Sequence, residues 1–201
     1  MKINYQLICD KQIEEMTKDG KTPRLLLHSC CGPCSSYVIE YLSKFFDITV
    51  FFYNPNVFPQ EEYEKRFSAQ KEVVERLKTE NHVELVVGEY NHDAFVDSAR
   101  GFETAPEGGA RCTECFTLRL LESAKYAKAN GFDCFTTTLS VSPHKNAELL
   151  NTIGDEISKQ VGIPFLTADF KKREGYKRSI ELSRELDIYR QEYCGCEFSI
   201  R

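Results

Sequence analysis

Residues 24–37 read RLLLHSCCGPCSSY, an apolar run that leads through a cysteine-rich turn into a helix-forming segment. The leucines are typical of a buried strand. Pro33 suits the first turn of a helix, where a backbone N–H is not needed. Ligands of open α/β sheets bind beyond the carboxyl ends of the strands. The stretch therefore predicts an α/β architecture with a site at its cysteines.

Short apolar runs and amphipathic segments alternate along the rest of the chain, which is the pattern of βαβ units. The predicted strands are 24–28, 48–53, 83–87, 134–139 and 164–167. The predicted helices are 33–45, 59–80, 111–130, 143–160 and 174–187. We predict an α/β fold with a mainly parallel five-stranded sheet flanked by helices, in a single domain that spans residues 1–201.

Nine cysteines occur among the 201 residues, and seven of them form three clusters: Cys30, Cys31 and Cys34; Cys112 and Cys115; Cys194 and Cys196. Thiols grouped in this way, without a secretory signal, indicate metal or redox chemistry rather than disulfide staples. No run approaches about 18 consecutive apolar residues, the length of a membrane span. We therefore expect a cytoplasmic protein that does not bind membranes.

The dipole at the N-terminus of the helix that follows Cys30 and Cys31 favours thiolates. Neighbouring side chains diverge, so these sulfurs reach two irons of one cluster more readily than one tetrahedral ion. With Cys112 and Cys115 they make the four thiolates of a [4Fe-4S] centre. A structural zinc is the alternative. Cys31 and Cys34 alone also match the thioredoxin dithiol, but both alternatives leave other cysteines unexplained.

A single residue separates Cys194 from Cys196, so a disulfide between them would be strained and easily reduced. Such a pair suits a redox-active disulfide that passes electrons to a buried centre. Its thiolates also suit a second metal beside the first, with Cys34 as a further ligand. A tail with spare thiols is the remaining interpretation.

The formal net charge of −5 argues against a uniformly basic nucleic-acid binder. Residues 171–201 are the exception, with eight Lys or Arg against six Asp or Glu. A basic run there suits phosphate contacts, and an aromatic ring within it suits base stacking. A solvated helix face is an equally good interpretation. The candidate nucleic-acid-binding residues are Lys171, Lys172, Arg173, Tyr176, Lys177 and Arg178.

Five segments together closely resemble the QueH type of epoxyqueuosine reductase: CCGPCS at 30–35, EGGARCTEC at 107–115, TTTLSVSPHKN at 136–146, DFKKREGYKRS at 169–179 and YRQEYCGC at 189–196. The resemblance implies a cobalamin-independent enzyme that reduces the epoxide of epoxyqueuosine, at the wobble position of tRNA, to the alkene of queuosine. It also implies a sheet similar to HUP, or adenine-nucleotide-hydrolase-like, folds. In that sheet the cysteine loop replaces the phosphate loop, and helical additions surround the metal site.

Loss of the epoxide oxygen as water takes two electrons and two protons, and no motif for an organic hydride cofactor is present. Iron–sulfur chemistry fits this need, with a [4Fe-4S] cluster and an additional iron ion as the expected cofactors. We expect Cys194 and Cys196 to be catalytic as the redox-active pair. His144 is the candidate proton donor, with Tyr53 and Asp169 as alternatives.

The expected partners are tRNA carrying epoxyqueuosine and an external electron donor, and we expect a monomer whose segment 171–201 completes the site. Two other classes remain open. One is an iron–sulfur electron carrier or thiol–disulfide oxidoreductase that acts on proteins. The other is a zinc-stabilised nucleic-acid-binding module. A brown protein with about four irons per chain would favour the cluster over zinc.

Overall fold

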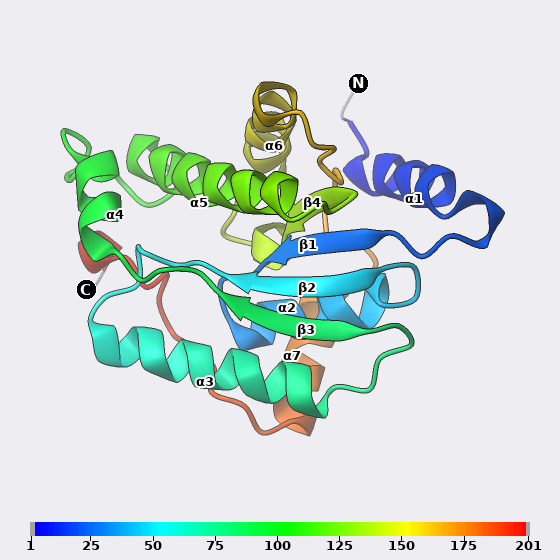
Figure 1. The fold of residues 1–201 in the computed structure, drawn as a ribbon. Coiled ribbons are helices and arrows are strands. Elements are labelled where there is room, and N and C mark those ends of the chain that lie inside the picture. The colour runs from blue at the N-terminus through cyan, green and yellow to red at the C-terminus, as the bar shows by residue number, and fades with distance from the viewer. Residues whose placement is uncertain (1–2, 200–201) are drawn as a thin grey trace.

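The computed structural model describes residues 3–199 as a parallel sheet between layers of helices (Figure 1). The strands are β1 Arg24–His28, β2 Asp47–Phe52, β3 Val83–Val87 and β4 Cys134–Thr137, in the order β3-β2-β1-β4. The helices are α1 Tyr5–Met16, α2 Gly32–Leu42, α3 Gln60–Arg76, α4 His92–Ala99, α5 Ala110–Ala129, α6 Ala147–Val161 and α7 Gly175–Glu185. The predicted α/β class is confirmed. The predicted ranges 1–201 and 171–201 each extend to residues outside 3–199.

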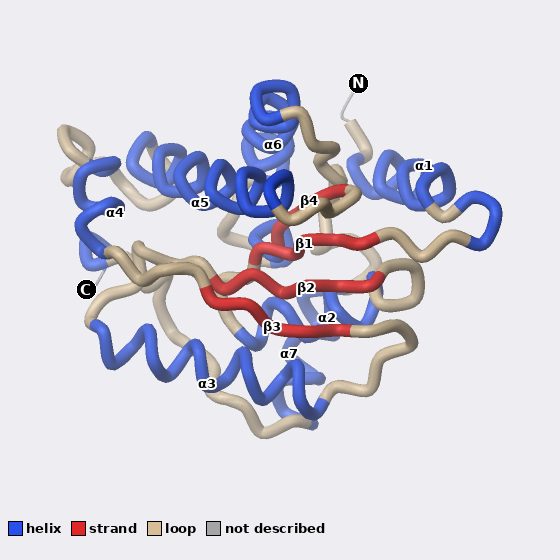
Figure 2. Tube along the Cα trace, viewed as in Figure 1, coloured by secondary structure: helices blue, strands red, loops and turns tan. Residues whose placement is uncertain are grey.

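The two faces of the sheet carry different helices, because successive side chains of a strand point to opposite sides. Leu26 of β1 packs with the apolar residues of α5 and α6. Leu25 and Leu27 pack on the other side with those of α2 and α3. Figure 2 shows the four strands enclosed by these helices, with α1 at the edge beyond β4. The sheet is therefore buried on both faces, as parallel sheets require.

The prediction of a fifth strand at 164–167 is wrong. Within the described residues this segment forms only an isolated bridge, Phe135 to Phe165, beside β4. Pro164 has no N–H to donate to a ladder. On the outer side, Gln12 of α1 accepts from the Thr167 N–H at 2.9 Å and donates to the Phe165 carbonyl at 3.2 Å. These two bonds lie on the side of the segment that faces away from β4. On the side that faces β4, the Leu166 carbonyl accepts from Thr136 Oγ1 at 2.8 Å and the Ala168 N–H donates to Asn151 Oδ1 at 3.0 Å. Side chains thus take the backbone groups that would continue the ladder with β4.

Four of the five predicted helices lie within a few residues of their expected ranges, and α6 begins later than expected. Asn146 sets that start, because its side chain accepts from the N–H groups of Glu148 and Leu149. The predicted strand 134–139 ends early, since Thr137 accepts from the Leu139 N–H and opens a 3-10 turn over Thr138–Val141. Helices α1 and α4 were not predicted, because each buries few residues.

The sheet topology decides where a site can form. From β1 the chain moves to β2 and β3 on one side, whereas β4 joins β1 on the other side. The carboxyl ends of β1 and β4 therefore flank the switch point at which α/β proteins bind ligands. In Figure 1 the strands point toward the side of the molecule that carries α4 and the C-terminus. No helix of residues 3–199 has the length and apolar character to cross a membrane.

Candidate metal and redox centre

The first cysteine cluster occupies the turn between β1 and α2, at the switch point. The Ser29 N–H donates to the Phe51 carbonyl at 3.0 Å, which fixes the start of the turn. The sulfurs of Cys30, Cys31 and Cys34 lie within 4.8 Å of one another, with Cys30 and Cys31 3.5 Å apart. This trio could hold a metal ion. In the described part of the chain no other three residues of the ligating types His, Cys, Asp and Glu meet that distance.

The three thiols share protons unequally. Hydrogen bonds with Cys31 and Cys34 hold the pKa of Cys30 well below its usual range. The same bond to Cys30 raises the pKa of Cys31 to about 12. The trio therefore carries its negative charge on Cys30, and metal binding would release the remaining protons.

A buried cation lies beneath this turn. Arg119 of α5 is 2% exposed, and it donates to Asn54 Oδ1 at 2.6 Å and to His28 Nε2 at 3.3 Å. Asn54 in turn donates to the Ser29 carbonyl at 2.8 Å. His28 Nε2 also lies 3.2 Å from the Tyr53 carbonyl, and Nδ1 lies 2.8 Å from Thr137 Oγ1, so both ring nitrogens have hydrogen-bond partners. Burial, and then the charge of Arg119, lowers the pKa of His28 to about 3, so the ring is neutral.

The second cluster occupies the first turns of α5. The backbone N–H of Gly108, whose φ of +85° favours glycine, donates to Cys112 Sγ at 3.1 Å. Arg119 donates to Cys115 Sγ at 3.9 Å, and burial raises the pKa of Cys115. Cys30 packs against the same apolar cluster as Cys112. The second cluster thus lies beside the first, although it is not part of the close trio.

The third cluster reaches both of the others. Gln191 donates to Cys31 Sγ at 2.9 Å, and Lys145 donates to Cys194 Sγ at 3.2 Å. Cys196 packs with Cys115 in a small apolar cluster. Burial alone would lower the pKa of Lys145, but the Cys194 sulfur raises it overall, so Lys145 is a cation. The three cysteine clusters therefore converge, although about 80 residues separate each from the next.

Cysteines of the first and third clusters line a cavity of about 720 Å³. Its lining includes Cys30, Cys34, His144, Lys145, Tyr176 and Cys194. Loops after β1 and β4, together with the C-terminal segment, thus form one cavity. Its volume lies in the range of sites that bind small molecules or single nucleosides.

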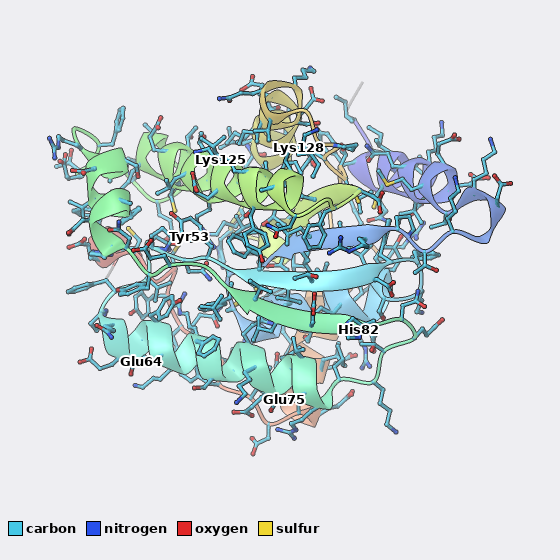
Figure 3. The ribbon with its side chains drawn as sticks, viewed as in Figure 1. Tyr53, Glu64, Glu75, His82, Lys125 and Lys128 are labelled. Atoms are coloured by element: carbon cyan, nitrogen blue, oxygen red, sulfur yellow. The ribbon has the colours of Figure 1, made fainter. Side chains whose placement is uncertain are left out.

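The three candidate proton donors occupy different environments in the structure. His144 is exposed and lines the cavity. Tyr53 lies between the sheet and α5 (Figure 3), stacked on Phe51, and burial raises the pKa of its hydroxyl. Asp169 is buried and pairs with Lys171 at 3.1 Å. His144 is therefore the one of the three that a substrate in the cavity can meet.

The basic residues at 171–178 also separate. Tyr176 lines the cavity, whereas Lys172 and Lys177 are exposed. Lys177 nevertheless pairs with Glu174 on the surface, at 3.4 Å. The other three are also held by ion pairs: Lys171 with Asp169, Arg173 with Asp10, and Arg178 with Glu40. Part of the positive charge that the sequence displays is therefore neutralised within the fold.

Four side chains that contact cysteine residues were not predicted: Arg66, Arg119, Lys145 and Gln191. Arg119 had a signal, since helical spacing places it on the same face as Cys112 and Cys115. Lys145 adjoins His144, the candidate proton donor. Arg66 gave none, because charged residues surround it along α3.

The fold and the cavity define an α/β protein with a thiol-rich centre suited to metal or redox chemistry. Residues 25–201 match the family described as Epoxyqueuosine reductase QueH. The chain belongs to this family.

The relatives that carry that name include the following three proteins. The protein of Streptococcus pyogenes serotype M1 is 42% identical, with 100% of this chain and 79% of the relative aligned. The protein of Staphylococcus epidermidis is 42% identical, over 98% of this chain and 85% of the relative. The protein of Thermotoga maritima is 38% identical, over 88% and 90%. The predicted resemblance is confirmed over most of the chain.

Proposed function

We propose that this oxidoreductase of the QueH family reduces the epoxide of epoxyqueuosine in tRNA to the alkene of queuosine. Two electrons and two protons enter, both C–O bonds of the epoxide break, and the oxygen leaves as water. The thiol trio Cys30, Cys31 and Cys34 on a nucleoside-sized cavity is the observation that carries this proposal. We also propose that the chain acts in the cytoplasm as a single-domain monomer that receives electrons from an external donor.

The residues at the site fit an anionic iron–sulfur group. Arg119 and Lys145 point at thiols, and within residues 3–199 neither has a carboxylate partner. Buried cations need a counter-charge, and a thiolate-bound cluster supplies one. Cys30, Cys31, Cys112 and Cys115 would hold a [4Fe-4S] cluster, which supplies single electrons when bound. Cys34, with Cys194 or Cys196, would hold an additional iron.

The chain's own residues divide the remaining work. Cys194 and Cys196 form the redox-active pair, because Cys194 lines the cavity and Cys196 packs against Cys115. His144, at the cavity wall, donates a proton to the departing oxygen. Tyr176 lines the same cavity and offers a flat ring on which a base can stack.

The tRNA backbone binds along the segment 171–178. Tyr176 lines the cavity, and the exposed lysines Lys172 and Lys177 lie within four residues of it along the chain, so the phosphates that flank a base inside the cavity would meet these lysines. Lys171, Arg173 and Arg178 add positive potential, although their ion pairs reduce it. Affinity should fall steeply with salt.

The decisive experiment incubates the anaerobically reconstituted, reduced protein with tRNA that contains epoxyqueuosine. Mass spectrometry of the digested nucleosides should show loss of one oxygen atom. Cys30→Ala should abolish the conversion, whereas Cys134→Ala, a change in the buried core outside the site, should preserve it.

Absence of conversion by the iron-loaded protein would overturn the proposal and favour an electron carrier or thiol–disulfide oxidoreductase. A colourless protein that binds one zinc per chain would instead contradict the cluster. These two outcomes are independent, since iron content is measured before any tRNA is added.

A further inference from the structure

The C-terminal thiol segment, residues 188–199, lacks the support of a helix or strand up to its short last turn at Glu197–Ser199. Its position on the cavity therefore depends on contacts made by individual side chains. Several of these contacts come from α3 and the loop that precedes it, and others involve Lys145, His92 and Cys31. Some of these side-chain contacts hold Cys194 and Cys196 in place.

Arg66 of α3 makes the closest set of contacts with this segment. Its Nη1 donates to the Cys194 carbonyl at 2.9 Å and its Nη2 to the Tyr193 carbonyl at 3.0 Å. Its Nε donates to Glu62 Oε1 at 2.7 Å. The guanidinium also lies over the Tyr193 ring, 5.2 Å from its centre. All three nitrogens of the rigid guanidinium thus donate a hydrogen bond, an arrangement that a lysine could not reproduce.

Glu62 adds a contact at a second point of the segment. It lies one turn before Arg66 on α3, and its other oxygen accepts from the Tyr189 hydroxyl at 2.8 Å. Both side chains are at least nine-tenths buried, so water does not screen the pair. Glu64 and Glu75 of the same helix project away from the sheet (Figure 3). One buried ion pair therefore holds the segment both at residue 189 and at residues 193–194.

The glycine between the two cysteines fits this seat. Gly195 has φ of +99°, and a Cβ there would lie 2.6 Å from Arg66 Nη1. Its carbonyl accepts from the Phe58 N–H at 2.8 Å. A larger residue would push the segment away from Arg66, so close approach requires glycine at this position.

We propose that Arg66, oriented by Glu62, is a positioning residue that seats Cys194 and Cys196 against the cavity. The consequence for turnover rests on the proposed function of those two thiols. The seat itself does not, because it is defined by contacts within the chain.

The test is hydrogen exchange of the full-length, metal-loaded protein, followed by mass spectrometry of peptides that cover residues 189–199. Arg66→Lys keeps the charge but loses the fork, and should raise exchange there by at least about tenfold. Gly195→Ala should do the same with Arg66 intact. Tyr189→Phe removes one hydrogen bond and should have a smaller effect.

The matched control is Arg76→Lys, since Arg76 forms the same four-residue-spaced pair with Glu72 on α3 but is half-exposed and does not contact the segment. It should leave exchange at 189–199 unchanged. If exchange there also stays unchanged in Arg66→Lys and Gly195→Ala, the seat is refuted. Arg66→Lys is preferred to Arg66→Met, which leaves Glu62 buried without a partner and risks misfolding.

Activity then separates the two proposals. With the seat and the proposed function both correct, Arg66→Lys lowers kcat for epoxyqueuosine-containing tRNA more than it raises KM. If exchange rises in the variants but the parent protein reduces no substrate, the seat stands and the proposed function fails.

Discussion

The cysteine turn at residues 29–34 and the C-terminal thiol segment at residues 188–199 face one cavity, but different forces hold them. The turn continues the central strand β1 and is bonded to β2 through the Ser29 N–H. Gly32 packs so tightly that a Cβ would lie 2.6 Å from the Ala69 carbonyl of α3. The segment, by contrast, is held by single side chains such as Arg66 and Gln191.

The difference matches the two roles that we propose for the thiols of this site. A metal site needs ligands in fixed positions, which backbone ladders and buried networks provide. A redox pair must open and close a bond, and an irregular segment allows this because few contacts need to break. We therefore expect the turn to retain its structure when the segment is altered, and each prediction below tests that independence.

The largest effect should come from the cysteines themselves. Cys30→Ala with Cys31→Ala should remove bound iron and bring tRNA reduction to background. Cys194→Ala with Cys196→Ala should remove the activity but retain most of the iron, because the four proposed cluster ligands are intact. Iron per chain and nucleoside mass spectrometry measure the two effects. Equal loss of iron in both variants would show that the two regions form one ligand set.

The next effect concerns the buried cations. Arg119→Met should weaken iron retention about 10-fold to 100-fold, as expected when a group that supports metal ligands is removed. Titration with a competing chelator measures it. The free energy of unfolding of the metal-free protein, measured in urea, should be affected less than iron retention is. The reason is that the lost cation has no carboxylate partner within residues 3–199. A variant that holds iron as tightly as the parent would contradict the charge argument.

The third prediction concerns pH and the network beneath the turn. The folded pKa of His28 is lowered to about 3, against 6.5 in the unfolded chain. The unfolded state therefore binds a proton first, and stability present above pH 6.5 is lost as the pH falls toward 3. Between pH 7.5 and pH 5 the loss should be about 2 kcal/mol.

Urea unfolding of the metal-free parent and of His28→Gln checks this loss. The variant should lack this part of the pH dependence. The same slope in both proteins would show that His28 does not contribute it.

The smallest effect should come from the exposed lysines beside the cavity. Lys172→Glu with Lys177→Glu should weaken tRNA binding about threefold to tenfold at moderate salt and reduce the salt dependence. Filter binding over a range of salt concentrations measures both. Lys125→Glu, on the exposed surface of α5, is the control (Figure 3). Equal affinity in the two variants would move the tRNA surface elsewhere.

Much of the fold follows from local pattern. Apolar runs such as Arg24–His28 and Val83–Val87 appear as predicted, because both faces of a parallel sheet must be apolar. The segment 164–167 has the same composition yet is no strand. Its ladder with β4 stops at one bridge because the side chains of Thr136 and Asn151 bind the Leu166 carbonyl and the Ala168 N–H, which no local pattern reveals.

The candidate site could likewise be predicted only in part from local sequence patterns. Cysteine spacing marked the three clusters, since thiols at two- or three-residue intervals are rare without a purpose. It did not reveal that Cys34 joins Cys30 and Cys31 within 4.8 Å, because that depends on how α2 begins. Nor did the basic composition of residues 171–178 reveal which charges face Asp10, Glu40 and Asp169.

The α/β class, the thiol chemistry and the family could be predicted from the sequence alone, since each depends on motifs whose residues are close together along the chain. Which cations neutralise the thiols, and which residues hold Cys194 and Cys196 in position, depends on the tertiary structure. Arg66, Arg119 and Lys145 come from three different segments, and burial alone distinguishes Arg66 and Arg119 from the exposed basic residues around them. Burial and long-range pairing arise when the sheet and helices pack together, so they cannot be read from any single segment.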